Sequence, residues 1–298
     1  MDMTVGFIVA AVFIGSLIGV LTGIFGVGGG FMLTPLLMIC IGVPGPVAVG
    51  TGLAVILVNS TYGLYKRRGS GTIDVKISVI ISTGSLVGVF IGSKLLNILS
   101  QAPKMMVLGR EQDTVQYVLL LAFFMLLGWI AGYLSYDYRK HSGIAPAVRV
   151  GMFSKWHIPP VGMFKSLEEP HLSIPLLVAF GLVVGILTGL LGVGGGVILL
   201  PALVYLVGQR TVKAAGTSLL LVWISSLVAV IKKGAGGDID LFLAAFLLAG
   251  GFLGTSIGTK IGLKFEGPKI RLYFIYIVIV AALLVLYKLI MLTFITQN

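Results

Sequence analysis

Long runs of apolar residues alternate with short polar stretches along the whole chain. A helix needs about 20 apolar residues to cross a bilayer, so this pattern predicts an all-α polytopic membrane protein. Two segments, 30–43 and 196–208, are too short to cross upright and are expected to form half-helices or re-entrant limbs. The ten predicted segments are 5–25, 30–43, 47–65, 75–98 and 115–135 in the first half, and 172–191, 196–208, 212–231, 240–263 and 270–294 in the second.

The two halves of the sequence are copies of each other. Residues 19–94 align with 185–260 without a gap, at a constant offset of 166, and 27 of the 76 aligned pairs are identical. Each copy contains a glycine-rich stretch, Gly19–Gly30 and Gly185–Gly196, which is followed by a short apolar run and a proline. The sequence therefore predicts two homologous repeats with broken or short helices at the glycine-rich motifs.

The stretch between the repeats is polar, basic and rich in proline. We expect it to be a linker or a small interfacial piece rather than a membrane span. The predicted organisation is a transmembrane repeat at 1–135, a basic cytoplasmic linker at 136–171 and a second transmembrane repeat at 172–298.

The distribution of basic residues distinguishes a parallel repeat from an inverted one. If each half crosses the membrane an odd number of times and the loop 66–76 is cytoplasmic, 15 basic residues lie on the cytoplasmic side. An even number of crossings splits them about 11 to 9. The positive-inside rule therefore favours the odd, inverted arrangement, with both termini outside. Lys232 and Lys233 are exceptions, because this arrangement places them on the outer side.

Composition supports the membrane assignment and narrows the partners. Apolar residues make up 57% of the chain and charged residues 10%, whereas soluble domains have about 25% charged residues. The net charge of +11 comes from basic residues in loops beside apolar spans, so no nucleic-acid partner is expected. The N-terminus has no Lys or Arg before the first apolar run, which argues against a secretory signal peptide. A multi-pass protein of the cytoplasmic membrane is predicted.

The chemistry available within the apolar segments is neutral. All ten acidic residues lie in loops or at segment ends, which argues against a carboxylate proton relay or a charged cation cage. No nucleophile and base, and no His, Cys, Asp or Glu cluster, has the spacing of a catalytic or metal site. We therefore expect no enzyme activity, no metal and no cofactor.

The glycine-rich breaks are the candidate binding site for an anion. The start of a helix offers free N–H groups and about half a positive charge, and successive glycine amides can form an anion-binding nest. Broken helices at matching places in two halves point to the substrate site of a transporter. The candidate substrate-binding residues are Thr22, Gly26, Gly28, Gly29, Gly30, Thr51, Asn59, Thr188, Gly192, Gly194, Gly195, Gly196, Thr217 and Ser218.

Several of these motifs also have purely structural interpretations. Gly19, Gly23 and Gly26 fit close helix packing, as small residues do in membranes. The hydroxyls of Thr51 and Thr217 can instead bond backbone within their own helices. Asp74 and Asp240 each precede an apolar segment, and N-capping is their expected role.

Taken together, the repeated motifs resemble the sulfite exporter TauE/SafE family. Each half contains Leu-Thr-Gly-x-x-Gly-Val-Gly-Gly-Gly, a short apolar run and Pro, then Ala-x-Gly-Thr-[Ser/Gly]-Leu, a basic turn with Gly-x-Ile-Asp, and Gly-x-x-x-Gly-x-x-x-Gly. The first copy has Gly52 where the second has the more typical Ser218. The resemblance implies a polytopic transporter that moves sulfite, sulfonates or related organosulfur anions across the cytoplasmic membrane, mostly outward.

The sequence thus predicts a transporter that exports sulfite or a small sulfonate by alternating access between the two repeats. The alternative within transport is an uptake permease, or a channel, for another small anion. A membrane enzyme lacks a convincing set of reacting groups, and a scaffold has no need of two matched broken helices. The expected partners are the small anion and the lipid bilayer, and a homo-oligomer is left open.

Overall fold

A computed structural model describes residues 5–107, 110–140, 151–156, 158–164, 167, 170–265 and 267–295. Within these residues, eight helices are long and apolar enough to cross a membrane, which confirms an all-α polytopic protein. The eight are α1 (Val5–Phe25), α3 (Gly45–Arg67), α4 (Val75–Ser100), α5 (Thr114–Lys140), α6 (Ile174–Leu191), α8 (Thr211–Ala235), α9 (Leu241–Lys264) and α10 (Gly267–Ile290).

Two further helices are short and follow the glycine-rich stretches, as predicted. They are α2 (Gly30–Leu36), continued by a π-helical turn at Leu37–Ile41, and α7 (Gly196–Tyr205). Each contains the proline of its motif, Pro35 or Pro201. A second π-helical turn, Met291–Ile295, extends α10.

The connecting segments contain short elements that the apolar pattern does not reveal. They are the hairpin of β1 (Met105–Val107) with β2 (Arg110–Gln112), a 3-10 turn at Met152–Lys155, and the hairpin of β3 (Val161–Met163) with β4 (His171–Ser173). Helix α5 continues to Lys140 and so extends into the predicted linker, because its last turn carries two cations that stabilise a helix C-terminus. The rest of the predicted linker 136–171 is described in part: 141–150, 157, 165–166 and 168–169 lie outside the described residues.

The first long helix of each half packs against a helix of the other half. Helix α1 packs along α9, and α6, its equivalent in the second half, packs along α4. A Cβ atom at Gly19 would overlap the carbonyl oxygen of Gly251, and one at Gly185 would overlap that of Ser85. These two contacts are related by the offset of 166. Glycine therefore lets the backbones touch in both helix pairs, the packing role expected for Gly19.

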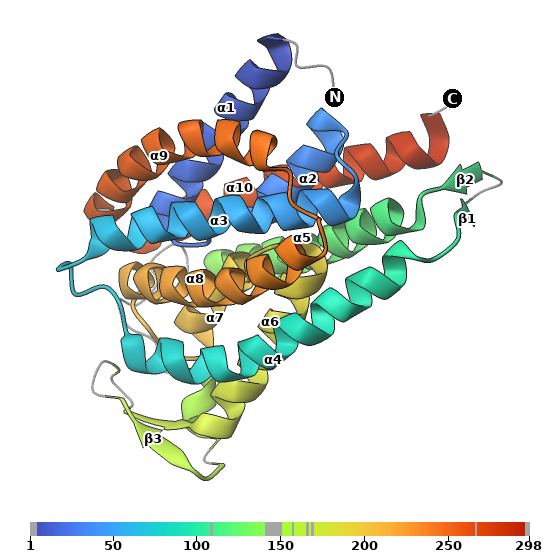
Figure 1. The fold of residues 1–298 in the computed structure, drawn as a ribbon. Coiled ribbons are helices and arrows are strands. Elements are labelled where there is room, and N and C mark those ends of the chain that lie inside the picture. The colour runs from blue at the N-terminus through green and yellow to red at the C-terminus, as the bar shows by residue number, and fades with distance from the viewer. Residues whose placement is uncertain are drawn as a thin grey trace.

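Helices α3 and α8 lie side by side near the centre of the molecule and run antiparallel (Figure 1). Gly50, near the start of α3, packs against the carbonyl of Asp238, just beyond the end of α8. Gly216, near the start of α8, packs in the same way against Thr72, beyond the end of α3. Equivalent helices that run in opposite directions are what an inverted repeat predicts.

The short helix α2 reverses the direction of the chain. Helices α1 and α3 both run parallel to α9, since residues of increasing number on each contact residues of increasing number on α9. The segment 26–44 between them must therefore return to the end where α1 begins. The short helix therefore lies between the two longer ones, and it places Gly28–Gly30 inside the protein rather than in a loop.

Candidate functional site

The glycine-rich breaks have backbone conformations that favour glycine. In the first break, φ is +66° at Gly26, +71° at Gly28 and +71° at Gly29. In the second, φ is +69° at Gly192, +68° at Gly194 and +78° at Gly195. Side chains other than glycine rarely adopt this left-handed region. The sequence thus codes for the same turn twice, between α1 and α2 and between α6 and α7.

The two breaks contact each other at the centre of the molecule. A Cβ atom at Gly30 would lie 2.6 Å from the carbonyl oxygen of Val193, and one at Gly196 would overlap the carbonyl of Val27. The backbones of the two repeats therefore touch at the points where their helices break. The structure brings together six of the predicted site residues here, Gly28, Gly29, Gly30, Gly194, Gly195 and Gly196.

Two equivalent side chains fill the space over the breaks. A Cβ atom at Gly28 would lie 2.6 Å from Val222 Cγ1 and 2.8 Å from Ile56 Cγ2, and Gly194 faces the same pair at 3.3 Å. Ile56 lies on α3 and Val222 is its equivalent on α8. Both are fully buried, so the centre of the molecule is closed in this conformation.

The start of each short helix retains donor capacity. Gly29 and Gly195 are the N-caps of α2 and α7, and neither helix start is capped by a side chain. Their carbonyls accept the first helical hydrogen bonds, whereas among the described residues the amides of Gly28 and Gly29 donate none. Free amides at a helix start attract negative charge.

The two threonines that precede the breaks use their protons within their own helices. Thr22 Oγ1 donates to the carbonyl of Ile18 and Thr188 Oγ1 to that of Val184, both at 2.9 Å. Each hydroxyl lies beside the N-cap glycine of its own repeat, Gly29 or Gly195. In this state they can offer an oxygen, but not a proton, to a ligand at the breaks.

Gly52 lacks the hydroxyl that its equivalent Ser218 has, and another residue of the first repeat supplies it. Ser218 Oγ donates to the carbonyl of Gly26 at 2.8 Å. The equivalent carbonyl, that of Gly192, accepts instead from Thr34 Oγ1 at 3.3 Å. A Cβ atom at Gly52 would lie 3.1 Å from that hydroxyl. The first repeat therefore supplies its hydroxyl from α2, and Gly52 makes room for it.

Thr51 and Thr217 tie each repeat to the loop of the other. Thr51 Oγ1 accepts from the amide of Asp240 at 2.9 Å, and Thr217 Oγ1 accepts from the amide of Asp74 at 3.1 Å. The aspartates cap α9 and α4 through their carboxylates, which confirms the expected N-cap role. Both threonine hydroxyls therefore accept a hydrogen bond at the start of a helix of the other repeat.

Asn59 is the remaining predicted site residue, and its amide group is unsatisfied. The side chain is fully buried in the middle of α3, and neither Oδ1 nor Nδ2 has a hydrogen-bond partner. Buried amides normally form hydrogen bonds, because leaving one unpaired costs about 1–3 kcal/mol. Asn59 thus retains free hydrogen-bonding capacity within the membrane.

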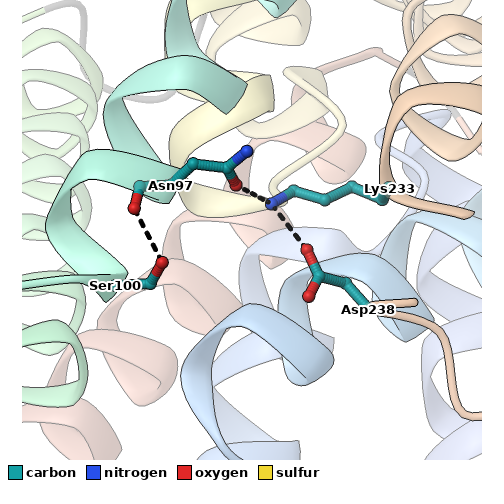
Figure 2. Close-up of polar contacts among 4 residues, drawn as sticks. All are labelled: Asn97, Ser100, Lys233 and Asp238. Atoms are coloured by element: carbon teal, nitrogen blue, oxygen red, sulfur yellow. Dashed lines mark hydrogen bonds and ion pairs between the residues drawn. The ribbon is translucent and has the colours of Figure 1, made fainter. Parts of the chain in front are cut away.

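The structure also contains two buried cations that the sequence analysis assigned to surface loops. Arg67 and Lys233 are 1% and 2% exposed, and the offset of 166 makes them equivalent. Lys233 Nζ pairs with Asp238 Oδ2 at 3.1 Å and donates to Asn97 Oδ1 at 3.4 Å (Figure 2). Both repeats carry a basic residue at this position, and that shared feature is the sequence signal for a buried cation.

A bundle of membrane-length helices, with two broken helices that meet at its centre, is the architecture of a polytopic membrane transporter. The chain belongs to the sulfite exporter TauE/SafE family, whose model matches residues 11–285. The expected family membership is thereby confirmed. Among the described residues, no group of three or more His, Cys, Asp or Glu side chains could hold a metal ion.

Relatives from bacteria and archaea are named as transporters. A Probable membrane transporter protein of Xylella fastidiosa is 26% identical over 96% of this chain and 97% of its own length. The Probable membrane transporter protein YjnA of Bacillus subtilis is 25% identical over 92% of this chain and 98% of its own. A Methanocaldococcus jannaschii counterpart, MJ0441, is 27% identical over 64% of this chain and 60% of its own. No solved structure matches the chain.

Proposed function

We propose that this transporter exports a small sulfur oxyanion, sulfite or a small sulfonate, across the cytoplasmic membrane by alternating access. The observation that carries the proposal is the meeting of the two glycine breaks, closed over by Ile56 and Val222. Free amides at two helix starts attract an anion without a fixed charge, so the ligand can also be released. The description of the family as sulfite exporters supports the choice of cargo.

The membrane potential supplies the driving force for export. An interior-negative potential drives an anion outward with about 2.3 kcal/mol per charge for each 100 mV. The acidic residues at the described span ends cap helices, pair with Lys233 or, in the case of Asp137, accept a hydrogen bond from Tyr205. None of them lies at mid-membrane, where a proton relay would need it. Facilitated efflux is therefore our proposed mechanism, and rocking of one repeat against the other exposes the breaks to each side in turn.

Binding and transport are tested on the purified, full-length protein. Thermal unfolding is followed with sulfite, sulfate, thiosulfate, taurine, sulfoacetate and chloride, because a ligand of the folded state raises its stability. Counterflow of labelled sulfite in proteoliposomes then separates a carrier from a channel, since a channel gives no counterflow. Stabilisation by a cation or a neutral compound alone would contradict an anion site.

The two side chains that close the breaks provide the site-directed test. Ile56→Phe and Val222→Phe should block transport, because a larger ring at either position fills the space in front of Gly28 and Gly194. Leu53→Phe is the matched control on α3, since Leu53 is equally buried but is not among the side chains nearest to these glycines. Equal losses of transport in all three variants would assign the effect to packing and remove the support for the site.

A further inference from the structure

Arg67 is buried where α1, α3 and α9 meet, and no carboxylate pairs with it among the described residues. Its Nη2 donates to the carbonyl of Gly23 at 2.8 Å and lies 3.4 Å from that of Ile24. These bonds cap the last turn of α1. Its Nε and Nη1 have no partner. Capping α1 accounts for one of the three nitrogens and leaves a buried charge with unused donors, which is costly without a ligand.

Arg67 ends a polar face of α3. Asn59, Gly63 and Arg67 follow each other at intervals of four residues, so they share one face of the helix. That face packs on α9, where a Cβ atom at Gly251 would lie 2.5 Å from Asn59 Oδ1. The face thus runs from the buried amide in the middle of α3 to the guanidinium at its basic end.

The facing side of α9 carries two threonines with unused hydroxyls. Thr255 and Thr259 are buried, and neither Oγ1 has a hydrogen-bond partner. Threonines in apolar helices commonly donate to the carbonyl four residues earlier, as Thr22 does here. Thr255 Cγ2 lies 3.6 Å from the position of a Cβ at Gly63. The carbonyl of Gly23 accepts the hydrogen bond of Arg67, and a Cβ atom at Gly23 would overlap the backbone amide of Thr259. Thr259 therefore lies close to the group that Arg67 caps.

The equivalent interface in the other half has hydrogen-bond partners at all but one of its polar positions. It consists of Ser225, Ala229 and Lys233 on α8 and of Ser85, Val89 and Ser93 on α4. Ser85 and Ser225 bond each other at 2.8 Å, and at the next turn Val89 stands where α9 has Thr255 and Ala229 where α3 has Gly63. Lys233 has Asp238 as its counter-ion (Figure 2). Of this interface, Ser93 alone among the described residues retains a buried side-chain oxygen without a partner.

We propose that the interface between α3 and α9 is a second binding site on the path of the transported oxyanion, where Arg67 supplies the positive charge and Thr255 and Thr259 supply hydrogen bonds. Asn59 lies about two turns earlier on α3, close to Ile56 and the glycine breaks. The inference rests on the proposed function, because it takes the cargo to be a small anion. A guanidinium presents several N–H donors in a fixed plane, which suits a ligand with two or more acceptor oxygens that share negative charge, such as sulfite or a sulfonate. The interface then leads from the basic end of α3 toward the breaks.

The test measures uptake of labelled sulfite by proteoliposomes as a function of sulfite concentration. Arg67→Gln should raise KM about tenfold or more, and Arg67→Lys should restore part of the loss, because it keeps the charge without the planar donors. Arg68→Gln is the control, since Arg68 is the exposed neighbour whose guanidinium stacks on Tyr65. It should leave KM within about twofold of the original protein.

Thr255→Val and Thr259→Val separate a binding role from a structural one. Each change removes a hydroxyl that bonds no protein group, so thermal stability should be kept while KM for sulfite rises. If Arg67→Gln lowers the unfolding temperature but leaves KM unchanged, Arg67 only caps α1 and the inference fails while the proposed function stands. If the original protein transports none of the oxyanions, the proposed function fails, and this inference fails with it.

Discussion

At the scale of single residues, the two repeats solve the same problem with different side chains. Gly26 and Gly192 directly follow the last residues of α1 and α6. Their carbonyls have no partner within the helix, so inside the membrane they need another hydrogen-bond donor. One receives it from Ser218 and the other from Thr34, which stands where the second repeat has Leu200. The donor has moved to another element while the carbonyl and the turn stay the same. A substitution at one repeat position is therefore informative only together with the group that its side chain contacts.

The ion pair of Lys233 and Asp238 gives a prediction at this scale. Asp238→Asn should lower the free energy of unfolding in detergent by about 2 kcal/mol, because it leaves a buried ammonium without its counter-ion. The estimate is below that for a fully buried pair, since the Asp238 side chain is 24% exposed. Lys233→Met should be better tolerated, because it removes the charge that needs compensation.

A double-mutant cycle measures the interaction itself. The variant with both Lys233→Met and Asp238→Asn should be more stable than the sum of the single changes predicts, with a coupling energy of about 1–2 kcal/mol. Lys232→Met is the control, since Lys232 is exposed and its ammonium lies over the ring of Phe90. Additive effects within about 0.3 kcal/mol would show that the pair contributes no net stability.

At the scale of elements, glycine spacing decides which helices touch. A Cβ at Gly254 would overlap the carbonyl of Ser16, and one at Gly258 would overlap that of Val20, one turn further along α1. Gly128 and Gly132 on α5 have the same spacing but no heavy atom within 4 Å of a Cβ.

We expect Gly254→Leu to abolish folding, because the two backbones must separate, and Gly128→Leu to be tolerated. The recovery of monodisperse protein after detergent extraction, measured by size-exclusion chromatography, compares the two variants. Similar yields would contradict a packing role for this stripe.

Much of the element scale is predictable from the sequence, because hydropathy and glycine determine it directly. The ten apolar segments, the short helices after the breaks and the capping by Asp74 and Asp240 all follow from local rules. The burial of Arg67 does not. A cation at the end of a span normally extends to the interface, and only the position of the last turn of α1 makes Arg67 an internal group.

The unsatisfied hydroxyls of α9 are also beyond local prediction. Thr255 and Thr259 are isolated polar residues in an apolar helix, and their hydroxyls could equally have bonded their own backbone, as that of Thr188 does. Whether such a hydroxyl is left free depends on its rotamer and on the helix it faces. The repeat alignment helps only in part: Ser93, the equivalent of Thr259, also has an unpartnered hydroxyl, whereas the equivalent of Thr255 is Val89.

At the scale of the whole molecule, the antiparallel arrangement of equivalent helices predicts an inverted membrane topology. The turn after α3 and the turn after α8 are equivalent in sequence, yet they lie at opposite ends of the α3–α8 pair. The start of α4, directly after the basic turn, also contacts the linker, because Lys76 Nζ donates to the carbonyl of Met163 in β3 at 2.6 Å. This contact places β3 at the same end as the loop 66–76, which is the end that the positive-inside rule predicts to be cytoplasmic.

Single cysteines test this topology in intact cells. In a Cys40→Ala background, Arg68→Cys and Ala235→Cys each place a thiol at an exposed position in one of the two equivalent turns. A membrane-impermeant maleimide should label Ala235→Cys from outside, whereas Arg68→Cys should react only after the membrane is permeabilised. Lys264→Cys, at the opposite end of α9 from Ala235, should behave as Arg68→Cys does, because one crossing separates the two ends. Labelling of both turns from the same side would require parallel repeats, and two such repeats could not place the breaks on a two-fold axis in the membrane plane. An inverted pair of repeats could then no longer explain how one central site opens first to one face of the membrane and then to the other.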